Sequence, residues 1–118
     1  MTSRVTEHSR LFNEAVRIGS WDTFTATFTP DAVMRFDGVP AGSYEGRDAI
    51  AAFYAASPPA STMTVMSVES SGDTDAVRFT WDDGRGGGTL RVRWHDDQVA
   101  DVTVTLQPQS ATGGRTVR

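Results

Sequence analysis

The stretch TDAVRFTWDDGRGGGTLRVRWHDDQVADVTVTL, residues 74–106, decides the fold, because apolar and polar side chains alternate along most of it. Alternation with a period of two is typical of a strand that buries one face and exposes the other. We expect strands at 74–82, 88–95 and 99–106, joined by turns at 83–87 and 96–97. The inward-facing side chains are expected to be Val77, Phe79 and Trp81, then Leu90, Val92 and Trp94, then Ala100, Val102, Val104 and Leu106.

A fourth strand is expected just before this stretch, at 62–69, where Val and Thr are frequent and a Ser-Gly-Asp turn follows. Four consecutive strands joined by short turns predict an antiparallel meander with one apolar face.

The first half of the chain has helical spacing. A helix is expected over 5–18, with Leu11, Phe12, Ala15 and Ile18 on one stripe and Gly19 at its end. A second helix is expected between 20 and 30, with Trp21, Phe24 and Phe28 sharing a face. The threonines at 23, 25, 27 and 29 also fit a strand there.

A short strand at 32–37 and another at 43–45 are expected next, separated by a glycine-containing loop. A third helix is expected from 47 to 56, before Pro58 and Pro59. Its inner stripe would be Ile50, Phe53, Tyr54 and Ser57.

These elements predict an α+β domain over residues 1–106, in which three helices cover the apolar face of a curved sheet. Residues 107–118 are interpreted as a flexible tail. A conical cavity would lie between sheet and helices and would suit a small hydrophobic ligand. We expect its lining to include Phe12, Met34, Phe53, Tyr54, Phe79, Trp81 and Trp94.

Composition limits the chemistry. The chain has 118 residues, no cysteine, a net charge of −4, and arginine at all eleven basic positions. Cysteine-based sites and lysine Schiff bases are therefore excluded, and the acidic balance argues against a nucleic-acid partner. We expect no membrane partner, no metal, no cofactor and a cytoplasmic location. His95 lies beside Asp96 and Asp97, but three adjacent residues of a turn do not make a metal site.

Three segments form a distinctive set: GSWD at 19–22, FTPDAV at 28–33 and YEGRDAIAAFY at 44–54. In this order they resemble the nuclear transport factor 2-like superfamily, in particular its ketosteroid isomerase and SnoaL-like polyketide cyclase branches. The resemblance extends over residues 5–106. It implies a cone of curved sheet with three helices and a homodimer formed through the outer sheet face. Arg78, Arg91 and Arg93 are expected on that face.

The resemblance also implies a catalytic role for Asp37, which occupies the place of the proton-shuttling aspartate of ketosteroid isomerases. A carboxylate at the mouth of an apolar cone could move a proton next to a carbonyl group. The tyrosine and aspartate of the isomerases' oxyanion hole correspond to Leu11 and Leu90, which cannot donate hydrogen bonds. Because that stabilisation is often the largest catalytic contribution, efficient ketosteroid isomerisation is not expected.

A further branch, the limonene epoxide hydrolase type, activates water with an Asp-Arg-Asp cluster. Arg35 and Asp37 lie on one side of their strand, but Asp101 is expected to face outward, so the set is incomplete.

Two functions remain open from the sequence. One is an isomerase or cyclase that uses Asp37 as base and needs no cofactor. The other is a non-catalytic ligand-binding or dimerisation module of the same fold. An inward Asp37 beside an open cavity would favour the enzyme, and an Asp37 turned to solvent would favour the module.

Overall fold

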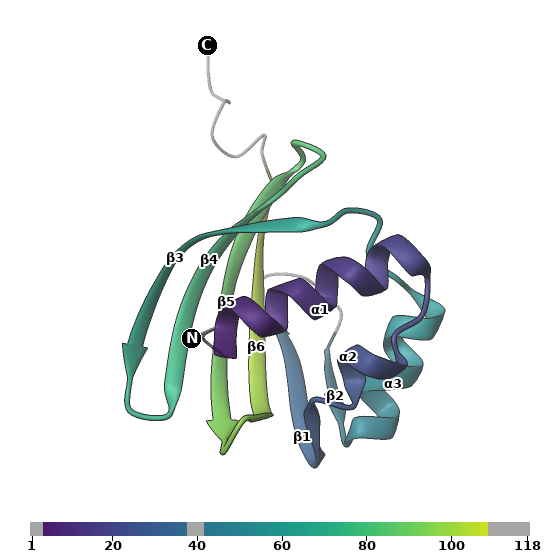
Figure 1. The fold of residues 1–118 in the computed structure, drawn as a ribbon, viewed down its shortest axis with the longest axis vertical. Helices are drawn as coiled ribbons and strands as arrows, with labels where there is room; N and C mark the ends of the chain where they lie inside the picture. Colours follow the sequence, from purple (N-terminus) through teal and green to yellow (C-terminus); the bar gives the residue numbers. More distant parts are fainter. Residues whose placement is uncertain (1–3, 38–41, 109–118) are drawn as a thin grey trace.

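The computed structural model describes residues 4–37 and 42–108, and it forms a sheet layer with a helical layer against its concave face (Figure 1). The sheet has six strands in the order β2-β1-β6-β5-β4-β3. No helix in the described ranges is both long enough and apolar enough to cross a membrane. The α+β fold class expected from the sequence is confirmed.

The first helix, α1 (Arg4–Ile18), crosses the front of the sheet in Figure 1. It buries Val5, His8, Phe12 and Ala15, a stripe with helical spacing. The expectation for Ile18 was wrong, because this side chain is 67% exposed at the last turn. Gly19 ends the helix with φ of 78° and donates its N–H to the carbonyl of Ala15.

The second helix, α2 (Asp22–Thr25), is a single turn, shorter than the sequence predicted. Trp21 and Phe24 are buried as expected, but Phe28 begins a strand instead of sharing the helix face. Thr25 and Thr27 explain the early end. Their hydroxyls donate to the backbone carbonyls of Trp21 and Phe24, and β-branched residues favour a strand over a helix.

Strand β1 (Phe28–Asp37) pairs antiparallel with β2 (Ser43–Glu45) and parallel with β6 (Gln98–Pro108). The sheet is therefore mixed, although its meander is antiparallel as predicted. Pro30 lies in β1, where the register shifts between Phe28 and Val33, so its missing N–H is tolerated. The third helix, α3 (Arg47–Ala56), has the predicted bounds and buries Ile50 and Tyr54.

The meander consists of β3 (Met63–Ser71), β4 (Thr74–Trp81), β5 (Gly86–His95) and β6. The expected inward residues of β4 and β5 are buried or half-buried. The expectation for Ala100 was wrong. The register shifts opposite Arg93 and Trp94, so Val99 is buried in its place. Strand β6 includes residues 107 and 108, and the rest of the predicted tail, 109–118, lies outside the described residues.

Glycines allow β5 to approach both neighbouring strands closely. A Cβ atom at Gly87 would overlap the carbonyl oxygen of Phe79 on β4, and one at Gly88 would overlap that of Thr105 on β6. In an untwisted strand a Cβ atom points out of the sheet and not at its neighbours. At Gly87 and Gly88 the Cβ direction points at a neighbouring strand instead, so the backbone is turned there relative to an ordinary strand. We attribute the bend of the sheet in Figure 1 to this turn, since glycine kinks are a known source of sheet curvature.

We predict that Gly88→Ala lowers the free energy of unfolding by about 1–3 kcal/mol or more, because backbone must move to admit the methyl group. Urea unfolding measures the change. Arg85→Ala, in the exposed turn before β5, serves as the control and should change stability by no more than about 0.5 kcal/mol. Equal stability of the two variants would contradict the assigned role of Gly88.

Candidate ligand-binding cavity

A cavity of about 240 Å³ lies between the concave face of the sheet and the helices. Its lining is almost entirely apolar and aromatic. The residues that line it are His8, Phe12, Phe28, Phe36, Phe53, Tyr54, Ser57, Pro59, Met63, Phe79, Trp81, Leu90, Val102, Val104 and Leu106.

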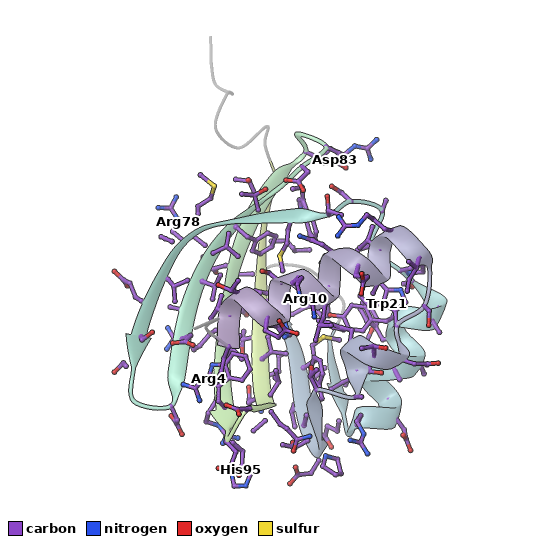
Figure 2. The ribbon with its side chains drawn as sticks, in the orientation of Figure 1. Arg4, Arg10, Trp21, Arg78, Asp83 and His95 are labelled. Carbon is purple, nitrogen blue, oxygen red and sulfur yellow. The ribbon has the colours of Figure 1, made fainter. Side chains whose placement is uncertain are left out.

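Aromatic rings from several elements hold one side of this cavity in place. Phe12 of α1 packs against the rings of Trp21, Phe24 and Trp81, with centroids 5.4, 5.7 and 6.1 Å away. Tyr54 of α3 stacks on Trp21 at 4.6 Å. Figure 2 shows Trp21 among the helices, at the end of the molecule where α1 meets α2 and α3. Packed rings have few alternative positions, so the walls of the cavity are expected to be rigid.

Five of the seven predicted lining residues are in the lining, and two are not. Phe12, Phe53, Tyr54, Phe79 and Trp81 line the cavity. Met34 and Trp94 do not belong to the lining, although both are buried. Alternation along a strand predicted their inward direction correctly, but it does not determine which inward residues border empty space.

Trp94 and Met34 are instead used in packing. The indole Nε1 of Trp94 donates to Asp75 at 2.9 Å, and this carboxylate is itself buried on the inner face of β4. Arg4 lies over the Trp94 ring, 5.1 Å from its centroid. The sulfur of Met34 accepts a hydrogen bond from the Tyr54 hydroxyl at 3.6 Å. Burial raises the pKa of Tyr54, so its hydroxyl stays protonated at neutral pH.

His8 is a polar residue of the lining, where sequence reasoning favoured a solvated histidine. It is 8% exposed, and its Nδ1 atom has no hydrogen-bond partner. The rings of Phe24, Phe28 and Trp94 surround it at 4.9, 6.1 and 6.1 Å. Burial lowers the pKa of His8 to about 4, so the imidazole is neutral near pH 7. Its spacing from Phe12 and Ala15 on the buried stripe was the available signal.

Asp37 lies outside the cavity lining. It is exposed at the end of β1, whereas the preceding residue, Phe36, lines the cavity. Neighbouring strand residues point to opposite faces of a sheet, so Asp37 shares the outer face with Arg35. This placement does not favour Asp37 as a base for a ligand held among the apolar side chains. It is the arrangement expected of the non-catalytic module.

The Asp-Arg-Asp alternative also falls on the outer face. Arg35 donates to both carboxylate oxygens of Asp101 at 2.8 Å, and the Arg35 side chain is 50% exposed. Arg35, Asp37 and Asp101 are all absent from the cavity lining. Leu90, which the resemblance matched to the isomerases' late-strand aspartate, contributes an apolar side chain to the lining.

The outer sheet face carries the predicted arginines. Arg78, Arg91 and Arg93 are exposed, and Figure 2 shows Arg78 on the side of the sheet away from the helices. A homodimer through this face stays a prediction. His95 and Asp83 lie at opposite ends of the molecule in the same view. Within residues 4–37 and 42–108, no three His, Asp or Glu side chains converge on a possible metal position.

The depressed pKa of His8 predicts a pH dependence of stability. Well above pH 6.5 the imidazole is neutral in both the folded and the unfolded chain, so it has no effect on the pH dependence of stability there. Between pH 6.5 and about 4 the unfolded chain takes up a proton that the folded chain does not, so stability falls as the pH falls. His8→Phe should lose about 2–3 kcal/mol less than the wild type between pH 7.5 and 4.5. Urea unfolding at both pH values measures this, and identical losses would contradict the burial of a neutral His8.

Solved structures with the same architecture are numerous. A SnoaL-like protein of unknown function from Burkholderia thailandensis superposes with a TM-score of 0.71 at 14% identity, covering 91% of this chain and 97% of that one. A protein from Kribbella flavida, provisionally assigned as a ketosteroid isomerase, gives 0.68 at 20% identity, with 99% and 92% covered. A provisionally assigned polyketide cyclase from Sinorhizobium meliloti gives 0.61 at 20% identity, with 83% and 93% covered. At these identities the likeness establishes the fold alone.

Comparison of sequences is more specific. No curated protein sequence matches the chain. A family model, described as the SnoaL-like domain, matches residues 9–102, which include most of the helices and of the meander. The resemblance seen in the three sequence segments is thereby confirmed, and the chain belongs to the SnoaL-like domain family.

Proposed function

We propose that this protein binds a small hydrophobic molecule in the cavity between its sheet and its helices. The observation that carries the proposal is the cavity itself, about 240 Å³ of space with an almost wholly apolar lining. Ligand sites in proteins are typically concave and apolar with a few polar groups, which describes this lining with His8, Tyr54 and Ser57.

The volume limits the size of the ligand. An apolar protein cavity of about 150 Å³ is known to hold benzene, and sites for drug-sized molecules begin at about 300 Å³. A cavity of about 240 Å³ therefore suits a compound of one or two rings better than one of four rings. The solved relatives named for ketosteroid isomerisation and polyketide cyclisation support a ring-containing ligand as a class.

Binding without catalysis is the better supported form of this proposal. Among the described residues, those that line the cavity include no carboxylate, and Asp37 is exposed on the other face of β1. His8, with a pKa of about 4, is a weak base. An isomerase or cyclase would need a group placed to take a proton and a donor placed to stabilise the resulting oxyanion.

We predict that naphthalene binds in a saturable way and changes the fluorescence of Trp81, and that Leu90→Trp abolishes this binding. The new indole would occupy the space that the ligand needs, because Leu90 lines the cavity. Calorimetric titration gives the affinity directly, and a series from benzene to a four-ring steroid tests the size limit. Saturable binding of the steroid with no binding of the smaller compounds would contradict the size argument.

Two variants serve as controls. Arg91→Trp adds the same ring to the exposed face of the same strand and should leave the affinity within about twofold of the wild type. Asp37→Asn should do the same, because Asp37 lies outside the lining. Failure of all compounds to bind the folded wild type would overturn the proposed function.

A further inference from the structure

We propose that the cavity selects ligands that carry a hydroxyl group, and that this group forms a hydrogen bond with Nδ1 of His8. The inference rests on the proposed function, since it names the polar feature that the bound molecule must have.

The first observation is an unmet hydrogen bond. Among the described residues, Nδ1 of His8 is the one buried side-chain nitrogen or oxygen atom without a hydrogen-bond partner. The residue is 8% exposed, and it borders the cavity. Buried polar atoms are nearly always paired in native proteins, so an unpaired one in a side chain that borders an empty space indicates where an additional partner fits. Nδ1 itself has almost no accessible surface, so the imidazole must turn about its side-chain bonds to meet a partner in the cavity.

The surroundings of His8 exclude a partner from the protein's own neighbouring rings. Phe24 and Phe28 are hydrocarbon rings, and the indole N–H of Trp94 is already donated to Asp75. The Tyr54 hydroxyl, another polar group in the lining, donates to the Met34 sulfur. None of these neighbours therefore uses the hydrogen-bonding capacity of the His8 Nδ1 atom, which is left for a molecule in the cavity once the ring turns toward it.

The charge state of His8 determines the chemical class of that partner. Its imidazole is neutral near pH 7, so one ring nitrogen donates a hydrogen bond and the other accepts one. A hydroxyl group can both donate and accept, and it therefore pairs with Nδ1 in either tautomer. A carboxylate or phosphate would be buried without a cation, because the part of the lining that the structure describes contains no arginine and the chain contains no lysine. These considerations favour small aromatic or alicyclic alcohols over anions.

The test compares 2-naphthol with 2-methylnaphthalene, which differ by a hydroxyl and a methyl group of similar size. Dissociation constants of both compounds are measured by NMR titration of the wild type and of His8→Phe. We expect the preference for 2-naphthol over 2-methylnaphthalene to fall about threefold to tenfold in His8→Phe, as the loss of one neutral hydrogen bond implies. His8→Asn, whose side-chain amide can place a polar atom near the position of Nδ1, should recover part of the preference.

The outcomes separate this inference from the proposed function. If both compounds bind the wild type and the ratio of their dissociation constants is the same in His8→Phe, the inference is wrong and the proposed function stands. If neither compound binds the wild type, both fail. His8→Leu provides the same comparison with a different apolar side chain should His8→Phe not fold, and an unchanged ratio there would equally overturn the inference.

Discussion

The close approach of β5 to β4 and β6 at Gly87 and Gly88 is the constraint on which the remaining structure depends. Any side chain at these two positions would overlap a carbonyl oxygen of a neighbouring strand. The bend that this approach permits carries part of the sheet away from the helical layer (Figure 1). Glycine kinks of this kind introduce curvature into sheets, and the cavity lies on the concave side of the sheet. The cavity therefore depends on the backbone geometry of β5 as well as on the side chains that line it.

The helices supply part of the surface that lines this cavity. Buried aromatic rings from α1, α2 and α3 contact one another and close one side of the cone. The inner faces of β4, β5 and β6 supply aliphatic and aromatic groups on the other side. Catalytically useful charges, such as Arg35 and Asp101, pair with each other on the outer face. The result is an apolar cavity whose lining includes His8, a buried polar side chain with one unpaired ring nitrogen.

The sequence predicted the fold well, because the side-chain periods of a strand, 2.0 residues, and of a helix, about 3.6 residues, follow directly from backbone geometry. Alternation placed Val77, Phe79 and Leu90 on the inner face, where the structure has them. It failed where a local irregularity intervened, as at Ala100, which a register shift removes from the core. Phe28 was assigned to a helix because its spacing from Trp21 and Phe24 suits one, but the intervening threonines favour a strand.

The site was less predictable than the fold. A cavity forms where the side chains of neighbouring elements leave space unfilled, and the pattern along a single element does not reveal that space. Met34 and Trp94 point inward, yet other side chains fill the space around them. Asp37 was placed by its position relative to a family pattern, and the register of β1 puts the neighbouring Phe36 inside instead. His8 flanks the buried stripe of α1, but a solvated ring was the favoured interpretation, because histidine is intermediate between the buried and the exposed residue types.

Diffraction from a crystal pressurised with xenon tests the central claim most directly, because xenon enters dry apolar cavities without needing a specific polar contact. The account predicts a xenon site bounded by Phe12, Phe79 and Val104, with the protein otherwise unchanged. A sheet packed against the helices at these residues, with no xenon between them, would contradict it.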